Sequence, residues 1–242
     1  MKIRIKFSKQ GAMKFIGHLD TMRYFQKVMR RADVDIRYSE GFSPHQIMSF
    51  AAPLGVGITS NGEYVDIEAL STDSSAEMVK RLNETMVEGV EVLSYRLLPD
   101  DAENAMSIVA ACDYTIVLRD DYENGLSMTA EEFYTGILDF IENGNLNIVK
   151  KTKKGEKEMD LKPLIYKAHR AENGDGLFLQ LSSGSAANVK PELVLEAYCK
   201  SIGKEYPQFA FRINREEVYA DAGDHDFVTL ESFGEEIGEK IG

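Results

Sequence analysis

Apolar and polar residues alternate at the start of the chain, where Ile3, Ile5 and Phe7 are separated by lysine and arginine. A period of two sends successive side chains to opposite faces of a strand, so residues 2–8 are predicted to form a half-buried strand. The same reasoning predicts four further extended segments in this half of the chain, at residues 35–38, 47–51, 63–70 and 90–97.

Helical spacing replaces the alternation in residues 18–32. Asp20 lies in the predicted first turn and two arginines lie in the last, which suits the helix dipole. A second helix is predicted over residues 74–86, with Ser74 or Ser75 as its N-terminal cap. One half of the first helix is apolar and is expected to face the core: Leu19, Met22, Phe25, Val28, Met29 and Ala32.

The second half of the chain repeats this order of elements. Thr129 and Glu132 have capping-box spacing at the start of a predicted helix over residues 129–142. The expected fold class is therefore α+β, with two tandem ferredoxin-like (β-α-β-β-α-β) sandwiches. The expected domains are residues 1–100, residues 111–220 and an acidic tail at 221–242. The other elements predicted in this half are strands at 113–118, 164–171, 176–183 and 209–218, a hairpin of 146–151 with 157–163, and a helix at 191–202.

Composition indicates a folded, soluble protein. Of 242 residues, 43% are hydrophobic, which is enough for a core, and no apolar run approaches the ~20 residues of a membrane helix. The chain starts with a strand pattern instead of the apolar block of a signal peptide, so a cytoplasmic location without membrane contact is expected. Cys112 and Cys199 provide too few thiolates for a zinc site or an iron–sulfur cluster, so we expect buried free thiols and neither a metal nor a cofactor in this chain.

The net charge of −12 hides an asymmetry along the chain. Residues 1–48 hold ten Lys/Arg and four Asp/Glu; out of totals of 28 and 40, this leaves 18 basic and 36 acidic residues for the rest. One region can therefore attract anions although the protein as a whole is acidic.

Two basic features are candidates for binding RNA or phosphate. Arginine and lysine form a stripe along the helix predicted at 18–32, and a lysine-rich hairpin follows near residue 150. The alternatives are a solvated helix face and a solubilising turn. Exposed aromatic residues near the stripe would add base stacking. The candidate RNA- or phosphate-binding residues are Lys14, Arg23, Lys27, Arg30, Arg31, Arg37, Tyr38, Phe42, Lys151, Lys153 and Lys154.

The candidate catalytic residues are His18, His45 and Asp20. His18 stands at the start of the predicted helix, whose positive end favours a neutral imidazole that can act as a general base. The alternative is a packed or capping histidine. His45 lies in a Ser/Gly/Pro loop of the kind that often carries function. Their spacing is too loose to predict a metal site, and no established catalytic motif is present, so we expect binding more than catalysis.

The opening stretch resembles the radical-SAM-linked family of uncharacterised bacterial proteins. The match extends over residues 2–220, and the motifs that carry it are specific. These motifs are Arg4, Phe7, Lys9, Gly11, Phe15 and His18-Leu19-Asp20, then Tyr38-Ser39-Glu40-Gly41-Phe42-Ser43-Pro44-His45, Ser49-Phe50-Ala51-Ala52-Pro53-Leu54, Glu63-Tyr64-Val65-Asp66 and Met159-Asp160-Leu161-Lys162-Pro163.

Members of that family occur fused to, or encoded beside, radical SAM enzymes, and near genes for ribosomal proteins and an RNA-processing nuclease. The resemblance implies an accessory protein that binds tRNA or rRNA, or presents a substrate to a radical SAM enzyme. That partner would carry the iron–sulfur cluster and S-adenosylmethionine, because this chain lacks the C-x-x-x-C-x-x-C motif. Two alternatives remain, a metal-independent ribonuclease using His18 and His45, and a protein–protein adaptor.

Overall fold

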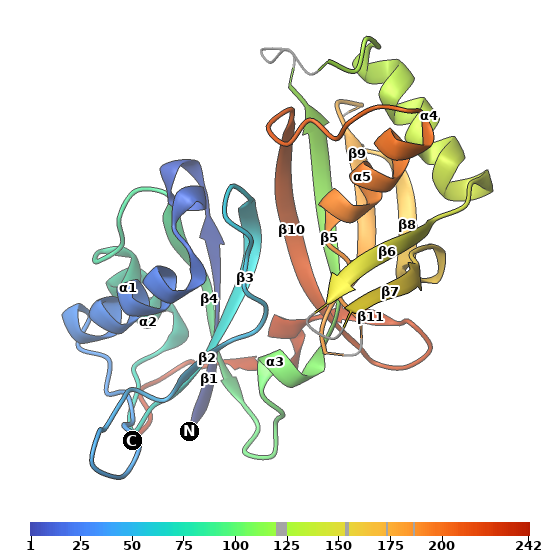
Figure 1. The fold of residues 1–242 in the computed structure, drawn as a ribbon. Helices are drawn as coiled ribbons and strands as arrows, with labels where there is room; N and C mark the ends of the chain where they lie inside the picture. Colours follow the sequence, from blue (N-terminus) through green and yellow to red (C-terminus); the bar gives the residue numbers. More distant parts are fainter. Residues whose placement is uncertain (120–124, 153–154, 173, 186) are drawn as a thin grey trace. The chain divides into compact units, whose positions relative to one another are not determined.

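The computed structural model describes residues 1–119, 125–152, 155–172, 174–185 and 187–242 (Figure 1). The chain divides into two compact units. The first consists of residues 1–110 together with 215–242, and the second of residues 111–214. This corrects the expected domains of residues 111–220 and 221–242, because the end of the closing strand and the acidic segment after it belong to the first unit.

The first unit is a sheet covered by helices. Strand β1 (Lys2–Lys9) pairs antiparallel with β3 (Thr59–Glu68) and with β4 (Val90–Leu98). The short β2 (Met48–Phe50) pairs with β3, which gives the order β4-β1-β3-β2. Helix α1 (His18–Arg31) and helix α2 (Ser75–Asn83) complete the expected β-α-β-β-α-β succession.

Both helices pack on one face of this sheet, where alternate side chains of β1 lie. Ile3, Ile5 and Phe7 belong to the same buried cluster as residues of α1 and α2. The Phe7 and Phe25 rings are 4.5 Å apart between centroids. The α-helical residues in this cluster are Phe25, Val28, Met29, Met78 and Leu82.

The sequence was right about the extent of α1 but wrong about Leu19, which is 62% exposed. Thr21 is buried in its place. At 100° per residue, Thr21 lies about 40° from Phe25 around the helix, whereas Leu19 lies about 120° away. The buried arc is thus narrower than a half wheel and is centred near Phe25.

Residues 35–38 do not form the expected strand. They make only two isolated bridges, one between Ile36 and Ala69 and one between Tyr38 and Gln46. A short helix that the sequence did not predict, α3 (Ala105–Ile108), precedes the second unit, and Asn104 caps it.

The C-terminal residues cover the other face of the first sheet. Arg4 pairs with Asp66 through Nε at 2.8 Å and donates to the Leu230 carbonyl over 3.0 Å. Lys6 bonds to Glu217 at 2.6 Å and to Glu231 at 2.7 Å. The short elements of this segment are β11 (Phe227–Thr229), the 3₁₀ helix η3 (Leu230–Phe233) and β12 (Glu235–Glu236), which pairs with β4.

In the second unit, β9 pairs antiparallel with β5 and with β8. The strand order is β10-β5-β9-β8, and β6 and β7 form a separate hairpin.

Thr129 and Glu132 form the predicted capping box. The α+β class is confirmed. The elements are β5 (Val109–Leu118), α4 (Ala130–Asn143), β6 (Asn147–Thr152), β7 (Gly155–Asp160), β8 (Ile165–Arg170), β9 (Leu177–Ser182), α5 (Pro191–Ser201) and β10 (Phe211–Asp221).

Cys112 and Cys199 are buried thiols, as the sequence predicted. Burial raises the pKa of Cys199 to about 11. This thiol is therefore protonated near neutral pH and is a poor nucleophile or metal ligand.

Candidate functional site

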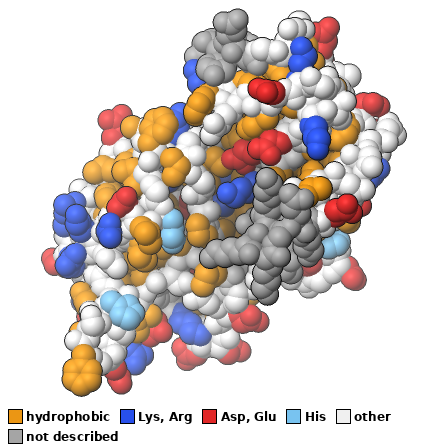
Figure 2. Space-filling view, in the orientation of Figure 1, with side chains coloured by type: hydrophobic (Ala, Val, Ile, Leu, Met, Phe, Trp, Pro, Cys, Tyr) orange, Lys and Arg blue, Asp and Glu red, His pale blue; other side chains and the backbone are white. Residues whose placement is uncertain are grey.

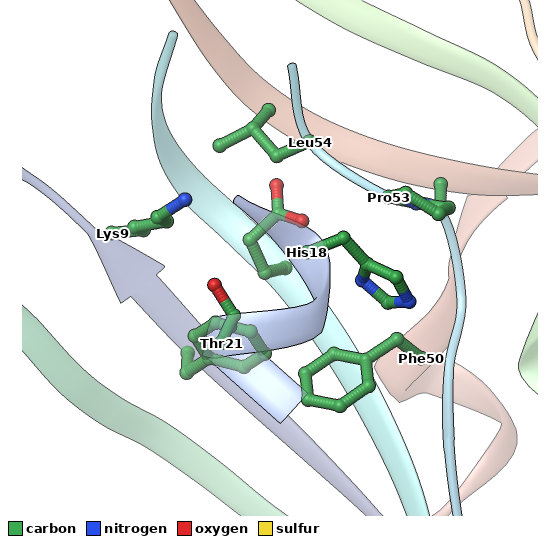
Figure 3. A pocket seen from close by; sticks show the side chains of 9 residues that line it. Lys9, His18, Thr21, Phe50, Pro53 and Leu54 are labelled. Carbon is green, nitrogen blue, oxygen red and sulfur yellow. The ribbon is translucent and has the colours of Figure 1, made fainter. Parts of the chain in front are cut away.

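A small cavity lies at the start of α1, lined also by the ends of β1 and β2 and by the middle of β3 (Figure 3). Its volume is about 10 Å³, which is the room that one water molecule or one oxygen atom needs. The lining residues come from four segments of the first unit: Phe7, Lys9, His18, Thr21, Phe50, Ala52, Pro53, Leu54 and Glu63.

Lys9 is the cation of this cavity. It is the last residue of β1 and is only 3% exposed. Its ammonium donates a hydrogen bond of 2.6 Å to the carbonyl of Ile16. Burial lowers the pKa of Lys9, which the Glu63 carboxylate opposes and the Arg215 guanidinium reinforces. A desolvated ammonium of this kind gains from any further acceptor that enters the cavity.

Glu63 lies across the cavity on β3 and is already neutralised. Arg215 donates from Nε to Glu63 Oε1 over 2.7 Å and from Nη2 to the other carboxylate oxygen. The same Nη2 donates to the carbonyl of Ala52 at 2.7 Å. Glu63 and Arg215 are both buried, so their fork-to-fork pairing leaves the Lys9 charge without a carboxylate of its own.

His18 contributes an imidazole to the lining of the cavity. It is the first residue of α1 and meets the ring of Phe50 edge-on, with centroids 5.5 Å apart and planes at 89°. Among the described residues, no group hydrogen-bonds to its imidazole nitrogens. Figure 3 shows the His18 ring beside Phe50 and Pro53, and both His18 and Lys9 line the cavity. The imidazole is thus available to donate to, or accept from, a ligand.

The other two candidate catalytic residues do not line this cavity. Asp20 is exposed on the first turn of α1 and pairs with Arg23 at 3.1 Å. His45 lies in an exposed loop, where its Nδ1 is 2.8 Å from the hydroxyl of Ser39. The structure therefore brings His18 together with Lys9 and Glu63 instead of with Asp20 and His45.

The predicted basic stripe is exposed along α1. Arg23, Lys27, Arg30 and Arg31 are all exposed, and only Arg23 has an ion-pair partner within the part of the chain that the structure describes. Arg30 donates from Nε to the carbonyl of Gln26 at 3.2 Å, which leaves its terminal nitrogens outward. Lysine and arginine side chains gather on the surface where α1 lies (Figure 2). This face can bind an anion without first breaking a strong ion pair.

The remaining candidate binding residues are placed more variously. Lys14 lies over the ring of Phe15 at 5.2 Å, and Arg37 pairs with Glu68 at 3.1 Å. Tyr38 is exposed, and Phe42 is fully exposed at the tip of the 39–45 loop. Lys151 lies in β6 opposite Glu156, whereas Lys153 and Lys154 lie outside the described residues.

Three exposed apolar side chains lie close to the cavity. Phe15 is 67% exposed, Leu19 62% and Val56 63%. The amide of Gly57 donates to the carbonyl of Lys14 at 2.8 Å, so the loop that holds Val56 runs beside the segment that leads into α1. These residues are called the apolar rim (Phe15, Leu19, Val56) of the cavity.

Three residues of the site are not among the candidate site residues predicted from the sequence: Lys9, Glu63 and Arg215. The signal for two of them was present, because Lys9 follows Ile3, Ile5 and Phe7 on the inward face of β1. Glu63 likewise shares an inward face with Val65 and Ile67. A charged residue at an inward strand position needs a partner or a function. Arg215 gave no such signal, because its partner lies 152 positions away.

Within the described residues, no helix is long and apolar enough to cross a membrane, and no three His, Cys, Asp or Glu side chains are arranged to hold a metal ion.

Known proteins that resemble this chain include a sequence family and a solved structure of weak likeness. No curated protein matches the chain. The solved structures include one titled "Crystal Structure of a Cbf5-Nop10-Gar1 Complex", with a TM-score of 0.44 and 10% sequence identity. The match covers 89% of this chain and 48% of that one, so this chain spans about half the length of the solved chain.

Residues 2–191 match a sequence family described as an uncharacterized protein conserved in bacteria (DUF2344). This range includes every residue that lines the cavity and every candidate binding residue on α1. The chain therefore belongs to the DUF2344 family of bacterial proteins.

Proposed function

We propose that this protein is an RNA-binding accessory protein, which holds RNA for a partner enzyme. The observation that carries the proposal is the exposed basic stripe of α1, on a protein whose net charge is −12. Non-specific attraction to a polyanion is weak for such a protein, so a local positive face directs an anion to one place.

The chemistry of the stripe suits a phosphate backbone. Lys27, Arg30 and Arg31 have no acidic partner among the described side chains, and arginine binds phosphate through two parallel hydrogen bonds. Exposed aromatic residues support single-stranded RNA as the ligand, since unstacked bases stack on such rings. Phe15, Tyr38 and Phe42 are available for this in the first unit.

A radical SAM enzyme is the partner that the opening motifs suggest, with tRNA or rRNA as the RNA. Both cysteines of this chain are buried, so the cluster and S-adenosylmethionine would belong to the partner.

We also assign both units to the ferredoxin-like type. In the first unit the order β4-β1-β3-β2 supports this, and in the second the order β10-β5-β9-β8 does so, with the β6–β7 hairpin as an insertion.

A ribonuclease that uses His18 and His45 together finds less support, because only His18 lines the cavity. The adaptor alternative has no specific contact in its favour within the described part of the chain.

A salt titration of RNA binding tests the proposal. Fluorescence anisotropy with labelled tRNA and rRNA fragments should show binding at low salt that weakens as salt rises. The paired substitutions Lys27→Glu and Arg31→Glu should weaken binding and reduce the slope of log K against log[salt] by about 1.4, or about 0.7 for each lost phosphate contact.

The matched control is the pair Lys190→Glu and Lys200→Glu, two exposed lysines of the second unit that lie outside the stripe. It makes the same change in net charge and should alter binding far less. Absence of binding at low salt would contradict the proposal, and so would an equal loss in both double variants.

A further inference from the structure

We propose that the cavity between Lys9 and His18 receives the terminal phosphate of a single-stranded RNA. This inference rests on the proposed function, since it names the part of the RNA that the first unit recognises. The basic stripe of α1 would hold the backbone, and the cavity would hold the end.

The charge of the cavity favours an anion. Lys9 and Glu63 line the cavity together with His18, and the Glu63 carboxylate is paired with Arg215. Lys9 then remains as a buried positive charge. Its ammonium has three donors, and the Ile16 carbonyl is its only acceptor among the described residues. A buried charge without a counter-ion is costly, and a phosphate oxygen would supply both charge and acceptor.

His18 adds a second donor from a different element. Its ring meets the ring of Phe50 edge-on, and a ring nitrogen that carries a hydrogen can donate to a ligand. Lys9 from β1 and His18 from α1 both line one small volume. Two donors on rigid elements are the minimum arrangement for holding a phosphate in a defined orientation.

The shape of the cavity selects the end of a chain over its middle. There is room for about one oxygen atom, and Lys9 is recessed, with 3% of its surface exposed. An internal phosphodiester carries a bulky nucleoside on each side, which prevents it from entering a recess of this size. A terminal phosphate carries one nucleoside, so an oxygen can enter while the rest of the group stays at the opening.

The surroundings suit the nucleoside that would follow. The apolar rim of Phe15, Leu19 and Val56 offers an aromatic face for the terminal base. Lys14 lies over the ring of Phe15 and adds a positive charge beside it. Arg23, one turn into α1, begins the basic stripe that leads away from the cavity.

Three RNAs of one sequence test the inference. Each is a single strand of about ten nucleotides, within the range that single-strand-binding folds cover. One ends in a 5′-phosphate, one in a 3′-phosphate and one in hydroxyl groups only, and an internal fluorophore reports anisotropy. One of the two phosphorylated RNAs should bind at least about tenfold more tightly than the hydroxyl-ended RNA, as expected for hydrogen bonds to a charged group.

Variants of the cavity should remove this preference without abolishing binding. Lys9→Met keeps the length of the side chain and removes its charge, so binding should fall to the level of the hydroxyl-ended RNA. Lys80→Met on the exposed face of α2 is the matched control and should retain the preference. His18→Phe keeps a ring against Phe50 and should reduce the preference several-fold, which decides the matter if circular dichroism shows that Lys9→Met does not fold.

Equal binding of the three RNAs by the unaltered protein would overturn the inference and leave the proposed function standing. A phosphate preference that persists in every folded cavity variant would overturn it as well. If none of the RNAs binds at low salt, the proposed function fails together with the inference.

Discussion

Arg215 donates hydrogen bonds to both carboxylate oxygens of Glu63, although 152 positions separate the two residues in the sequence. Arg215 also donates to the carbonyl of Ala52, so one guanidinium fastens β3 and the loop that borders the cavity. The pair stabilises the wall of the cavity and cancels the one carboxylate that would otherwise neutralise Lys9.

Removal of one member of this pair should destabilise the protein strongly. Arg215→Met leaves the Glu63 carboxylate buried without its partner, which costs about 3–5 kcal/mol. The double variant Arg215→Met with Glu63→Leu should recover much of this loss, because it leaves no unpaired charge. Urea unfolding followed by circular dichroism measures both values.

The control is the Arg37–Glu68 pair, in which the Arg37 side chain is half exposed. Arg37→Met should cost no more than about 1 kcal/mol. Equal losses for Arg215→Met and Arg37→Met would show that the buried pair has no special weight.

Stability should depend on pH through the Lys6–Glu231 contact. Burial raises the pKa of Glu231, but hydrogen bonds from Lys6 and Ser94 outweigh it and lower this pKa below its ordinary 4.5. Stability from a lowered carboxyl pKa is present above pH 4.5 and is lost as the pH falls through the folded-state pKa. The measurement is the urea midpoint of unfolding above and below this pH. Acidification should lower the midpoint less in Glu231→Gln than in the unaltered protein.

Lys6 contributes at the opposite end of the pH scale. Burial lowers its pKa, but the hydrogen bonds to Glu217 and Glu231 outweigh it and raise this pKa above 10.5. The contribution of Lys6 to stability is therefore complete below pH 10.5 and is lost as the pH rises through the higher folded-state pKa.

The control for Glu231→Gln is Glu235→Gln, at an exposed position of β12. This variant should lose as much stability on acidification as the unaltered protein does.

Gly136→Ala should destabilise the second unit, against the usual trend for helices. In an exposed helix interior, alanine is better than glycine by about 1 kcal/mol. At Gly136 on α4, however, a Cβ would overlap the hydroxyl of Tyr198, which is buried on α5. Overpacking of this kind costs about 1–3 kcal/mol, so a net loss is expected in urea unfolding. Gly238→Ala, where a Cβ meets open space, should be nearly neutral, and a gain of stability in Gly136→Ala would refute the argument.

Neither cysteine should react with a thiol reagent in the native state. Cys112 and Cys199 are buried, and burial raises the pKa of Cys199 to about 11. A disulfide-exchange reagent that releases a coloured thiolate should therefore titrate no thiols in buffer and two per chain in urea. Rapid release of one equivalent from the native protein would mean that one thiol is accessible.

Periodicity was sufficient to locate the long elements. The helix predicted at residues 18–32 is observed as His18–Arg31, the cap at Thr129 is as predicted, and Ser74 is the one of the two candidate serines that caps α2. These features depend on neighbours within four residues, which a sequence displays directly. The strand predicted at residues 35–38 was wrong, because this segment makes only two isolated bridges, to Gln46 and Ala69. Whether such distant partners pair over more than one residue does not show in the local sequence.

The candidate site was predicted only in part. His18 stood out because it begins a helix, and the basic stripe because charge can be counted. Lys9 and Glu63 are charged residues at inward positions of predicted strands. The alternating pattern was used to place the apolar side chains, and these two charges were not taken as site residues. The Glu63–Arg215 pair was beyond reach, since it depends on which distant strand lies next to β3.

The way in which residues 215–242 complete the first unit has a consequence for synthesis. Domains generally fold as units while the chain is made, with N-terminal parts first. Here the ribosome makes residues 1–110 early, yet Arg215 and Glu231 follow only after the whole second unit has been translated. The inner unit can therefore finish folding before the outer one, and the cavity at Lys9 reaches its final form only when the last part of the chain has emerged.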